Sequence, residues 1–360
     1  YESLFGKQVD EELFQFSWES YLIAHKLYGS YIDRGKPHPF HSEWAKYLRW
    51  VCSKANANIR INRVVKLDLI ENDRFRVFYL KKGEEKSDDY DGVVFTGPGQ
   101  PLKVGNKGHE WIHAKIIDGQ QYWTNIPIFR ELSNDRRVAI IGAGETAASI
   151  AVSLTRNCPN INIEIINRAG VLYTRGESFY ENEIYTNPKR WDDLDEVDRL
   201  EFIRRTDRGV FSVESKKEID QSTRIKTITG TVIGIERDGK TVIVELDRIN
   251  QKKEYIYDVV IVAIGFDPLW PLDLLTEDKR SNFPTVNRQR RQSALKTVSN
   301  MVDKFLRVSL PLAENGKYVN LHLPMLSGLK QCPGFPNLSC LGHLSDRIIA
   351  TYVSPESANK

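Results

Sequence analysis

The sequence predicts an α/β protein with two Rossmann-like dinucleotide-binding domains, one inserted into the other, and a small helical domain. Three observations support this fold class. A strand–turn–helix unit with a glycine fingerprint occupies residues 138–151, two apolar strands that end in glycine bracket it at 93–97 and 259–265, and an aromatic, charged stretch at 176–223 interrupts the α/β alternation.

The glycine fingerprint lies in "VAIIGAGETAASIA". The apolar run 138–141 predicts a buried parallel strand, and Gly142 suits the tight turn after it. A second glycine lets the backbone approach a pyrophosphate, and an alanine in the third position allows close packing of helix and strand. We therefore expect a dinucleotide pyrophosphate at the start of this helix, held by Gly142, Gly144, Glu145, Thr146 and Ala147.

The next strand, "INIEIINRAG", indicates which dinucleotide binds. Sites for NAD usually end this strand in an acidic residue that binds the ribose hydroxyls. Here the strand ends in Asn167 and Arg168, and an arginine can pair bidentately with a 2′-phosphate. The sequence therefore favours NADPH, with Arg168 at the 2′-phosphate and Arg175 nearby; the alternative is that Arg168 is a solvated surface residue.

Composition limits the class of protein. Among 360 residues, 28% are charged and 41% hydrophobic, and the net charge is +3, which is typical of a soluble globular protein without a nucleic-acid partner. No apolar run is long enough to span a membrane. Four scattered cysteines, with no CxxC pair and no metal-ligand spacing, favour a reducing cytoplasm and argue against a thiol reductase or a metal site.

The order of segments predicts the domain boundaries. We expect a host domain from 1–125 and 260–360, an inserted dinucleotide domain from 126–175 and 224–259, and a helical substrate-binding insertion from 176–223. The two glycine-ending strands, 93–97 and 259–265, are expected to belong together in the host domain. The chain opens at Tyr1 with no glycine fingerprint for that domain, so its first βαβ unit is expected upstream, in a longer protein.

Four stretches carry a resemblance to a known family: "IDRGKPHPFHSEWAKYLRW", "GAGETAAS", "FYENEIY" and "GHLSD". They resemble the flavin-dependent N-hydroxylating monooxygenases of siderophore biosynthesis. The stretches "YTRGESFYEN", "RRTDRGVFS" and "LPMLSGLKQCPGFPNLSCLGHLSDRI" are similar to the mycobactin-type L-lysine N6-monooxygenases. The resemblance implies FAD in the host domain, NADPH in the inserted domain, and O2 as co-substrate.

The resemblance also implies which residues bind each ligand. Substrate contacts are expected from Asn182, Asp207, Arg208 and Ser345, and flavin contacts from Thr96, Gly97, Gly265, His343, Leu344, Ser345 and Asp346. Ser345 and Asp346 are expected to begin the final helix, where its N-terminus would stabilise negative charge on the reduced flavin. No catalytic side chain is expected, since a flavin hydroperoxide would pass its hydroxyl to the amine.

The implied reaction is hydroxylation of the side-chain amine of L-lysine for hydroxamate siderophore biosynthesis and iron acquisition. Ornithine or a diamine is the alternative substrate. A different two-domain flavoprotein, or a non-catalytic nucleotide-binding module if the flavin fingerprint is truly absent, is the alternative class. A homo-oligomer is compatible with the sequence, which does not determine the oligomeric state.

Overall fold

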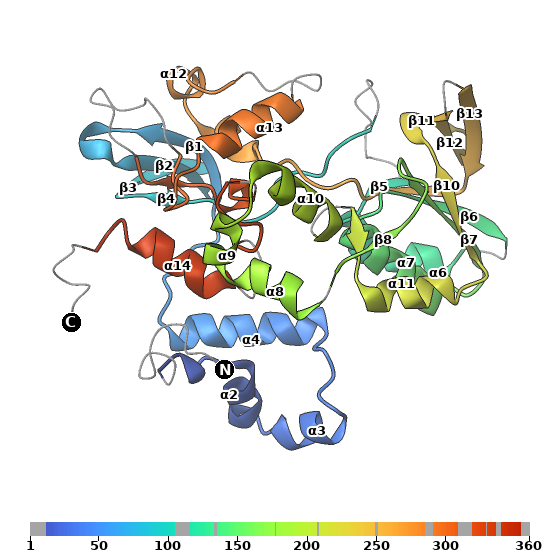
Figure 1. Cartoon of the computed structure of the whole chain (residues 1–360), viewed down its shortest axis with the longest axis horizontal. Helices are drawn as coiled ribbons and strands as arrows, with labels where there is room; N and C mark the ends of the chain where they lie inside the picture. Colours follow the sequence, from blue (N-terminus) through green and yellow to red (C-terminus); the bar gives the residue numbers. More distant parts are fainter. Residues whose placement is uncertain are drawn as a thin grey trace. The chain divides into compact units, whose positions relative to one another are not determined.

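The computed structural model describes residues 12–104, 115–132, 135–176, 178–206, 209–248, 251–284, 291–308, 319–328, 330–335 and 340–353 (Figure 1). The chain divides into two compact units, described separately below. The first consists of Tyr1–Arg63 with Leu80–Glu84, and the second of Val64–Tyr79 with Glu85–Lys360.

The first unit is mainly helical in its described part. Its helices are α2 (Trp18–Ala24), α3 (Tyr28–Asp33) and α4 (His41–Lys54). Ser17 caps α2 by accepting a hydrogen bond from the Ser20 N–H. Aromatic side chains join α2 to α4, because the Trp18 ring lies 5.7 Å from Trp44 and 5.5 Å from Tyr47, centroid to centroid.

A five-stranded parallel sheet is the centre of the inserted dinucleotide domain. Its strand order is β10-β7-β6-β14-β5, and every neighbouring pair runs parallel. The glycine fingerprint follows the central strand β6, and the helix α7 leads on to β7, so the predicted βαβ unit is confirmed. The strands are β5 (Ile116–Asp118), β6 (Arg136–Ile141), β7 (Ile161–Asn167), β10 (Ile225–Thr229) and β14 (Val259–Val262).

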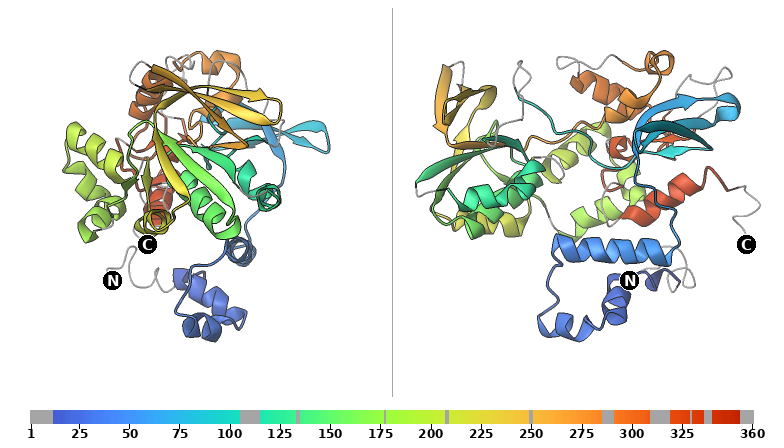
Figure 2. Two further views of the ribbon diagram at one scale, coloured as in Figure 1. Left: turned by 90° about the vertical axis from the view of Figure 1, so that its right-hand side faces the viewer. Right: turned by 180° about the vertical axis from the view of Figure 1, so that it is seen from behind.

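Alternate residues of each strand point to opposite sides of this sheet, and both sides are buried against other elements. Val138 and Ile140 belong to the cluster under the helices α7 (Glu145–Asn157) and α11 (Val213–Asp220). Their neighbours Ala139 and Ile141 belong to a second cluster with the antiparallel sheet β11-β12-β13, on the other face (Figure 2). Its strands are β11 (Thr231–Asp238), β12 (Thr241–Arg248) and β13 (Gln251–Tyr257), and the hairpin between β11 and β12 turns at Gly239.

The structure corrects three expected domain boundaries. The strand β14 pairs with β6 rather than with the host strands, so 259–265 is not a host-domain strand. The strand β5 pairs with β14 in the same sheet, although it lies in the stretch 1–125. The helix α11 packs under the sheet through Ile219, so the helical insertion does not extend to 223. Each element joins the dinucleotide sheet because its apolar residues are buried there.

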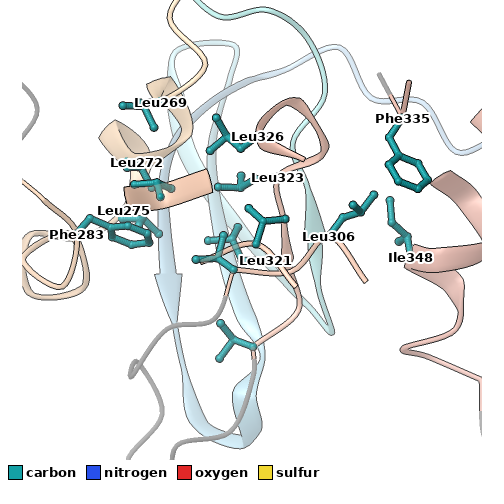
Figure 3. Close-up of a cluster of buried hydrophobic side chains, with 14 of the residues drawn as sticks. Leu269, Leu272, Leu275, Phe283, Leu306, Leu321, Leu323, Leu326, Phe335 and Ile348 are labelled. Atoms are coloured by element: carbon teal, nitrogen blue, oxygen red, sulfur yellow. The ribbon is translucent and has the colours of Figure 1, made fainter. Parts of the chain in front are cut away.

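The remainder of the second unit contains the host-domain sheets. The strands β1 (Arg63–Leu69), β2 (Phe75–Lys81) and β3 (Glu84–Tyr90) form one sheet, and β4 (Val93–Val94) pairs in parallel with β15 (Leu321–His322). Figure 3 shows the leucine-rich core beside β15, to which Leu321, Leu323 and Leu326 contribute. The other elements here are η1 (Glu71–Asp73), η2 (Trp270–Leu274), α12 (Glu277–Arg280), α13 (Arg291–Asn300), η3 (Pro324–Leu326) and α14 (Leu341–Ile349).

The inserted stretch after β7 is helical, as predicted, up to Thr206. Ile184 and Trp191 of this stretch are buried in the same core as Leu321 of β15. The elements between β7 and β10 are β8 (Tyr173–Thr174), α8 (Phe179–Thr186), α9 (Pro188–Asp192), α10 (Glu196–Thr206) and β9 (Val210–Phe211); between β5 and β6 lie α5 (Gln121–Thr124) and α6 (Ile126–Arg130).

The chain enters and leaves the dinucleotide domain through two segments that run antiparallel to each other. Pro101 forms a bridge with Phe266, the Leu102 N–H donates to the Gly265 oxygen at 2.9 Å, and the Asp267 N–H donates to the Gln100 oxygen at 2.8 Å. The two glycine-ending segments predicted to bracket the domain therefore meet just beyond their glycines.

Candidate nucleotide and substrate sites

The glycine turn after β6 has the geometry that a dinucleotide requires. Gly142 has a φ of +130°, and a Cβ there would lie 2.2 Å from the Ala263 oxygen, so only glycine fits. Gly144 caps α7 with an ordinary φ of −99°, and a Cβ there would meet nothing within 4 Å. The open space faces the first turn of α7, whose N–H groups have no intrahelical partner. This turn fits a pyrophosphate.

The next three predicted residues have different surroundings. The Glu145 carboxylate accepts a hydrogen bond from the Ser212 N–H at 2.9 Å, so it fixes the start of α11, and only its main chain faces the open turn. The Thr146 methyl carbon would lie 2.7 Å from a Cβ on Gly119. Ala147 is fully buried, which confirms its predicted role in the packing of α7 on the sheet.

The end of β7 is polar, and some hydrogen-bond donors there have no partner among the described residues. Asn167 is 6% exposed; its Oδ1 accepts a hydrogen bond from the Gly170 N–H at 2.8 Å, while its buried Nδ2 has no partner in the described part of the chain. Nε of Arg175 is likewise buried and unpaired there. Arg168 is exposed and forms no salt bridge with a described residue. Unused donors and a cation at this edge fit a ribose phosphate.

The predicted flavin-side glycines lie in the segments that join the two domains. Gly97 has a φ of +94° and Gly265 a φ of +95°, and a Cβ on either would meet nothing within 4 Å. Thr96 and Gly97 follow β4 directly. Beside them the Trp270 ring packs edge-on against Phe95, with 5.3 Å between centroids. These open glycines leave backbone accessible after β4 and after β14, where the flavin contacts are expected.

The expected start of the final helix is wrong. The helix α14 begins at Leu341, with Cys340 as its N-cap residue, so Ser345 and Asp346 lie in its second turn. Free N–H groups belong to the first turn only, which extends to His343 and includes neither Ser345 nor Asp346. The partial positive charge at the start of α14 therefore lies one turn earlier than predicted.

Asn182 lies on the exposed side of α8, in its first half. A capping box fixes the start of this helix, because Ser178 accepts a hydrogen bond from the Glu181 N–H while Glu181 accepts one from the Ser178 N–H at 3.0 Å. Glu183 forms an ion pair with Arg190 of α9 at 3.1 Å. The other two expected substrate residues, Asp207 and Arg208, lie outside the described residues.

Among the predicted site residues that the structure describes, Asp346 alone lines a hollow of about 620 Å³ next to α14. Arg199 and Arg347 line it, but their guanidinium groups donate to main-chain oxygens of Trp191 and Lys304. Within the described ranges, no three histidine, cysteine or acidic side chains are placed to hold a metal ion. None of the described helices combines the length and the apolar character that crossing a membrane requires.

A parallel dinucleotide domain inserted into a second α/β domain, with an added helical segment, defines a two-domain nucleotide-dependent oxidoreductase. The chain belongs to the L-lysine 6-monooxygenase/L-ornithine 5-monooxygenase family, whose sequence profile matches residues 13–268. This match confirms the resemblance stated from the motifs.

Relatives with known names match nearly the whole chain. L-lysine N6-monooxygenase MbtG of Mycobacterium sp. (strain MCS) is 34% identical over 98% of this chain and 78% of its own length. Its namesake in Mycobacterium tuberculosis (strain ATCC 25618 / H37Rv) is 33% identical over 95% and 76%.

Solved structures agree with this fold. Lysine monooxygenase NbtG from Nocardia farcinica superposes with a TM-score of 0.75 at 31% identity, covering 97% of this chain and 82% of that one. The Kutzneria sp. 744 ornithine N-hydroxylase KtzI has a TM-score of 0.71 at 20% identity, covering 94% and 82%, and so supports the fold alone.

Two features of these sites were not predicted from the sequence. The unpaired amide of Asn167 is visible only in three dimensions, although its place at the end of β7 was a signal. Tyr185, three residues after Asn182 in "FYENEIY", is buried and bonded to two other segments. Its spacing from Asn182 was the available signal, because residues three apart lie on one face of a helix.

Proposed function

We propose that this protein is an NADPH- and FAD-dependent monooxygenase that hydroxylates the side-chain N6 of L-lysine with O2, for hydroxamate siderophore biosynthesis. The observation that carries this proposal is the contrast between relatives. Lysine N6-monooxygenases match 95–98% of the chain at 32–34% identity. L-ornithine N(5)-monooxygenase of Burkholderia cepacia matches only 48% of it, at 24%.

Each of the two domains is proposed to bind one cofactor. When bound, NADPH and FAD supply the electrons for the activation of O2 and for the transfer of one of its oxygen atoms to the substrate. The inserted domain would hold NADPH, with Gly142 and Gly144 against the pyrophosphate and with Arg168 and Arg175 near the 2′-phosphate. The flavin would be held by the host domain, at Thr96, Gly97 and Gly265 and at the residues 343–346 of α14.

The substrate amine must lose a proton before it can accept oxygen. A free lysine ammonium has a pKa near about 10.4, so its site must favour the neutral amine. Asn182 suits this task, because an uncharged amide accepts a hydrogen bond from the amine without stabilising the ammonium as a carboxylate would. Asp207, Arg208 and Ser345 are proposed to hold the α-groups of the amino acid.

The test measures NADPH oxidation and hydroxylamine formation by the flavin-loaded enzyme with L-lysine, L-ornithine and cadaverine in parallel. We expect hydroxylated product that matches the NADPH consumed with lysine, and mostly peroxide with the other two. Product from ornithine or cadaverine but not from lysine would transfer the proposal to that amine. NADPH oxidation without any hydroxylated product would reject hydroxylation.

Location and assembly are further parts of the proposal. None of the four cysteines forms a disulfide, as is usual for proteins in a reducing cytoplasm. We propose a cytoplasmic enzyme without a nucleic-acid partner that can form a homo-oligomer. Light scattering of the purified enzyme would measure the oligomeric state, and a mass equal to one chain at all concentrations would exclude the oligomer.

A further inference from the structure

Tyr185 connects the helix α8 to two other segments, one through its side chain and one through its main chain. It is 8% exposed, and it lies three residues after Asn182 on the same helix. Its hydroxyl contacts α10, and its carbonyl contacts the segment that leads into α14.

The hydroxyl of Tyr185 lies 2.8 Å from Oγ1 of Thr206, the last residue of α10. Thr206 is 1% exposed and donates its own hydroxyl hydrogen to the Phe202 oxygen at 2.7 Å. Since a hydroxyl has one hydrogen to donate, Tyr185 is the donor and Thr206 the acceptor in the contact between them. The direction of this buried bond is therefore fixed.

The carbonyl of Tyr185 belongs to the last turn of α8, where main-chain oxygens lack intrahelical partners. It accepts a hydrogen bond from Sγ of Cys340 at 2.6 Å, and Sγ of Cys332 lies 3.8 Å away. Gly334 packs so closely that a Cβ there would lie 1.9 Å from this oxygen. The buried end of α8 is thus capped by thiols from the C-terminal segment, and Cys340 is also the N-cap residue of α14.

We propose that Tyr185 is a positioning residue for N-hydroxylation, which holds Asn182 in register with α14, the helix of the expected flavin contacts. The inference rests on the proposed function. Tyr185 touches neither substrate nor cofactor in this role. Its two bonds fix the rotation and the axial position of α8, and these determine where the Asn182 amide lies relative to the residues 343–346.

The test compares Tyr185→Phe with Tyr122→Phe in the flavin-loaded enzyme. Tyr122 is a matched control, because it is fully buried and its hydroxyl donates to Oγ of Ser153 at 2.8 Å, in the core of the dinucleotide domain. Both variants lose one buried hydroxyl bond, so similar decreases in Tm are expected. Only Tyr185→Phe should lower the yield of hydroxylated lysine per NADPH, by about three- to tenfold if one such bond is lost.

A second pair of variants tests the bond from the other side. Thr206→Ser keeps the acceptor oxygen and should retain the wild-type yield, whereas Thr206→Val should lower it as Tyr185→Phe does. Combining Tyr185→Phe with Thr206→Val should add little further loss, because both remove the same bond. The rate of flavin reduction by NADPH without lysine should not change in any of them.

The outcomes separate this inference from the proposed function. Wild-type enzyme that does not hydroxylate lysine would reject both. Active wild-type enzyme with equal yields in Tyr185→Phe and Tyr122→Phe would reject the positioning role alone. Equal losses in Thr206→Ser and Thr206→Val would also reject it, because the hydroxyl bond would then not be responsible.

Discussion

The main-chain oxygen of Ala263 lies where a side chain on Gly142 would begin, 2.2 Å from an ideal Cβ. Ala263 directly follows β14, and its N–H donates to the Ile141 oxygen at 2.8 Å, so the close approach comes from the pairing of β14 with β6. The first glycine of the fingerprint is therefore required by the neighbouring strand as well as by the turn.

We predict that Gly142→Ala and Gly144→Ala fail in different ways. At Gly142 an alanine meets the Ala263 oxygen at a φ of +130°, so the free energy of unfolding should decrease by about 2 kcal/mol or more. At Gly144 nothing is within 4 Å, so Tm should hold while the KM for NADPH rises about tenfold or more, because the methyl group fills the phosphate space. Thermal unfolding and steady-state kinetics measure the two effects. A normal KM in Gly144→Ala would show that the pyrophosphate binds elsewhere.

Arg168→Ala should decrease the preference for NADPH over NADH. An exposed guanidinium without a described ion-pair partner is available for the 2′-phosphate, and charge-assisted hydrogen bonds of this kind contribute about 1.5–3 kcal/mol. We expect the KM for NADPH to rise roughly 10- to 100-fold and the KM for NADH to stay constant. Arg237→Ala, on the hairpin, is the control, because Arg237 donates to the nearby Gly239 oxygen and to no other described residue. Equal changes for both coenzymes would contradict the assignment.

Stability should decrease in acid because of His322. Burial is the main cause that lowers the pKa of its imidazole, and Arg307 lowers it further. The folded state therefore favours neutral histidine. The stability associated with this neutral form is fully present above the unfolded pKa of about 6.5. As the pH falls from there towards the folded pKa, the unfolded state binds the proton, and up to about 1.4 kcal/mol is lost per pH unit.

Denaturant unfolding between pH 5 and 8 measures this effect. The His322→Gln variant should lose part of the slope below about pH 6.5. Tyr352→Phe is the control, because its hydroxyl lies 3.1 Å from Nε2 of His322 and its loss leaves the buried imidazole in place. The control should be less stable at every pH and keep the slope. An unchanged slope in His322→Gln would exclude His322 as its origin.

The cysteines should react with thiol reagents in two groups. Cys52 is partly exposed, whereas Cys158, Cys332 and Cys340 are buried. Burial also raises the pKa of Cys332 to about 12, so little thiolate forms. Mass spectrometry after alkylation of the folded enzyme at pH 8 should find Cys52 modified and the other three protected until the protein unfolds. Early modification of Cys340 would show that the end of α8 opens in the native state.

Elements whose defining residues lie close together in the chain could be predicted from the sequence. The run 138–141, the glycine turn and α7 lie within a few residues of each other, and their pattern predicted the βαβ unit. The three-residue strand β5 carries too short a pattern to be recognised. The strand β14 was recognised, but the sheet that it joins was not, since a buried apolar run reads the same in any parallel sheet.

The site could be predicted only where a motif placed it. Gly142, Gly144 and Ala147 have the predicted surroundings because the turn defines them. The start of α14 was misplaced, since its N-cap residue is Cys340, whose side chain makes no capping bond, and sequence rules look for serine or aspartate there. The bonds of Tyr185 join segments far apart in the chain, and no local pattern encodes such pairings.

The antiparallel contact between residues 100–102 and 265–267 places the start and the end of the dinucleotide domain side by side. For the host domain, the dinucleotide sheet and its helices α7 and α11 are therefore inserted between two neighbouring positions. Residues can thus be gained or lost inside the dinucleotide domain without shifting the strands on either side of it. Changes within the sheet β10-β7-β6-β14-β5 can therefore alter coenzyme binding while these two positions stay together, whereas the helices between β7 and β10 are held to the host core by Ile184 and Trp191.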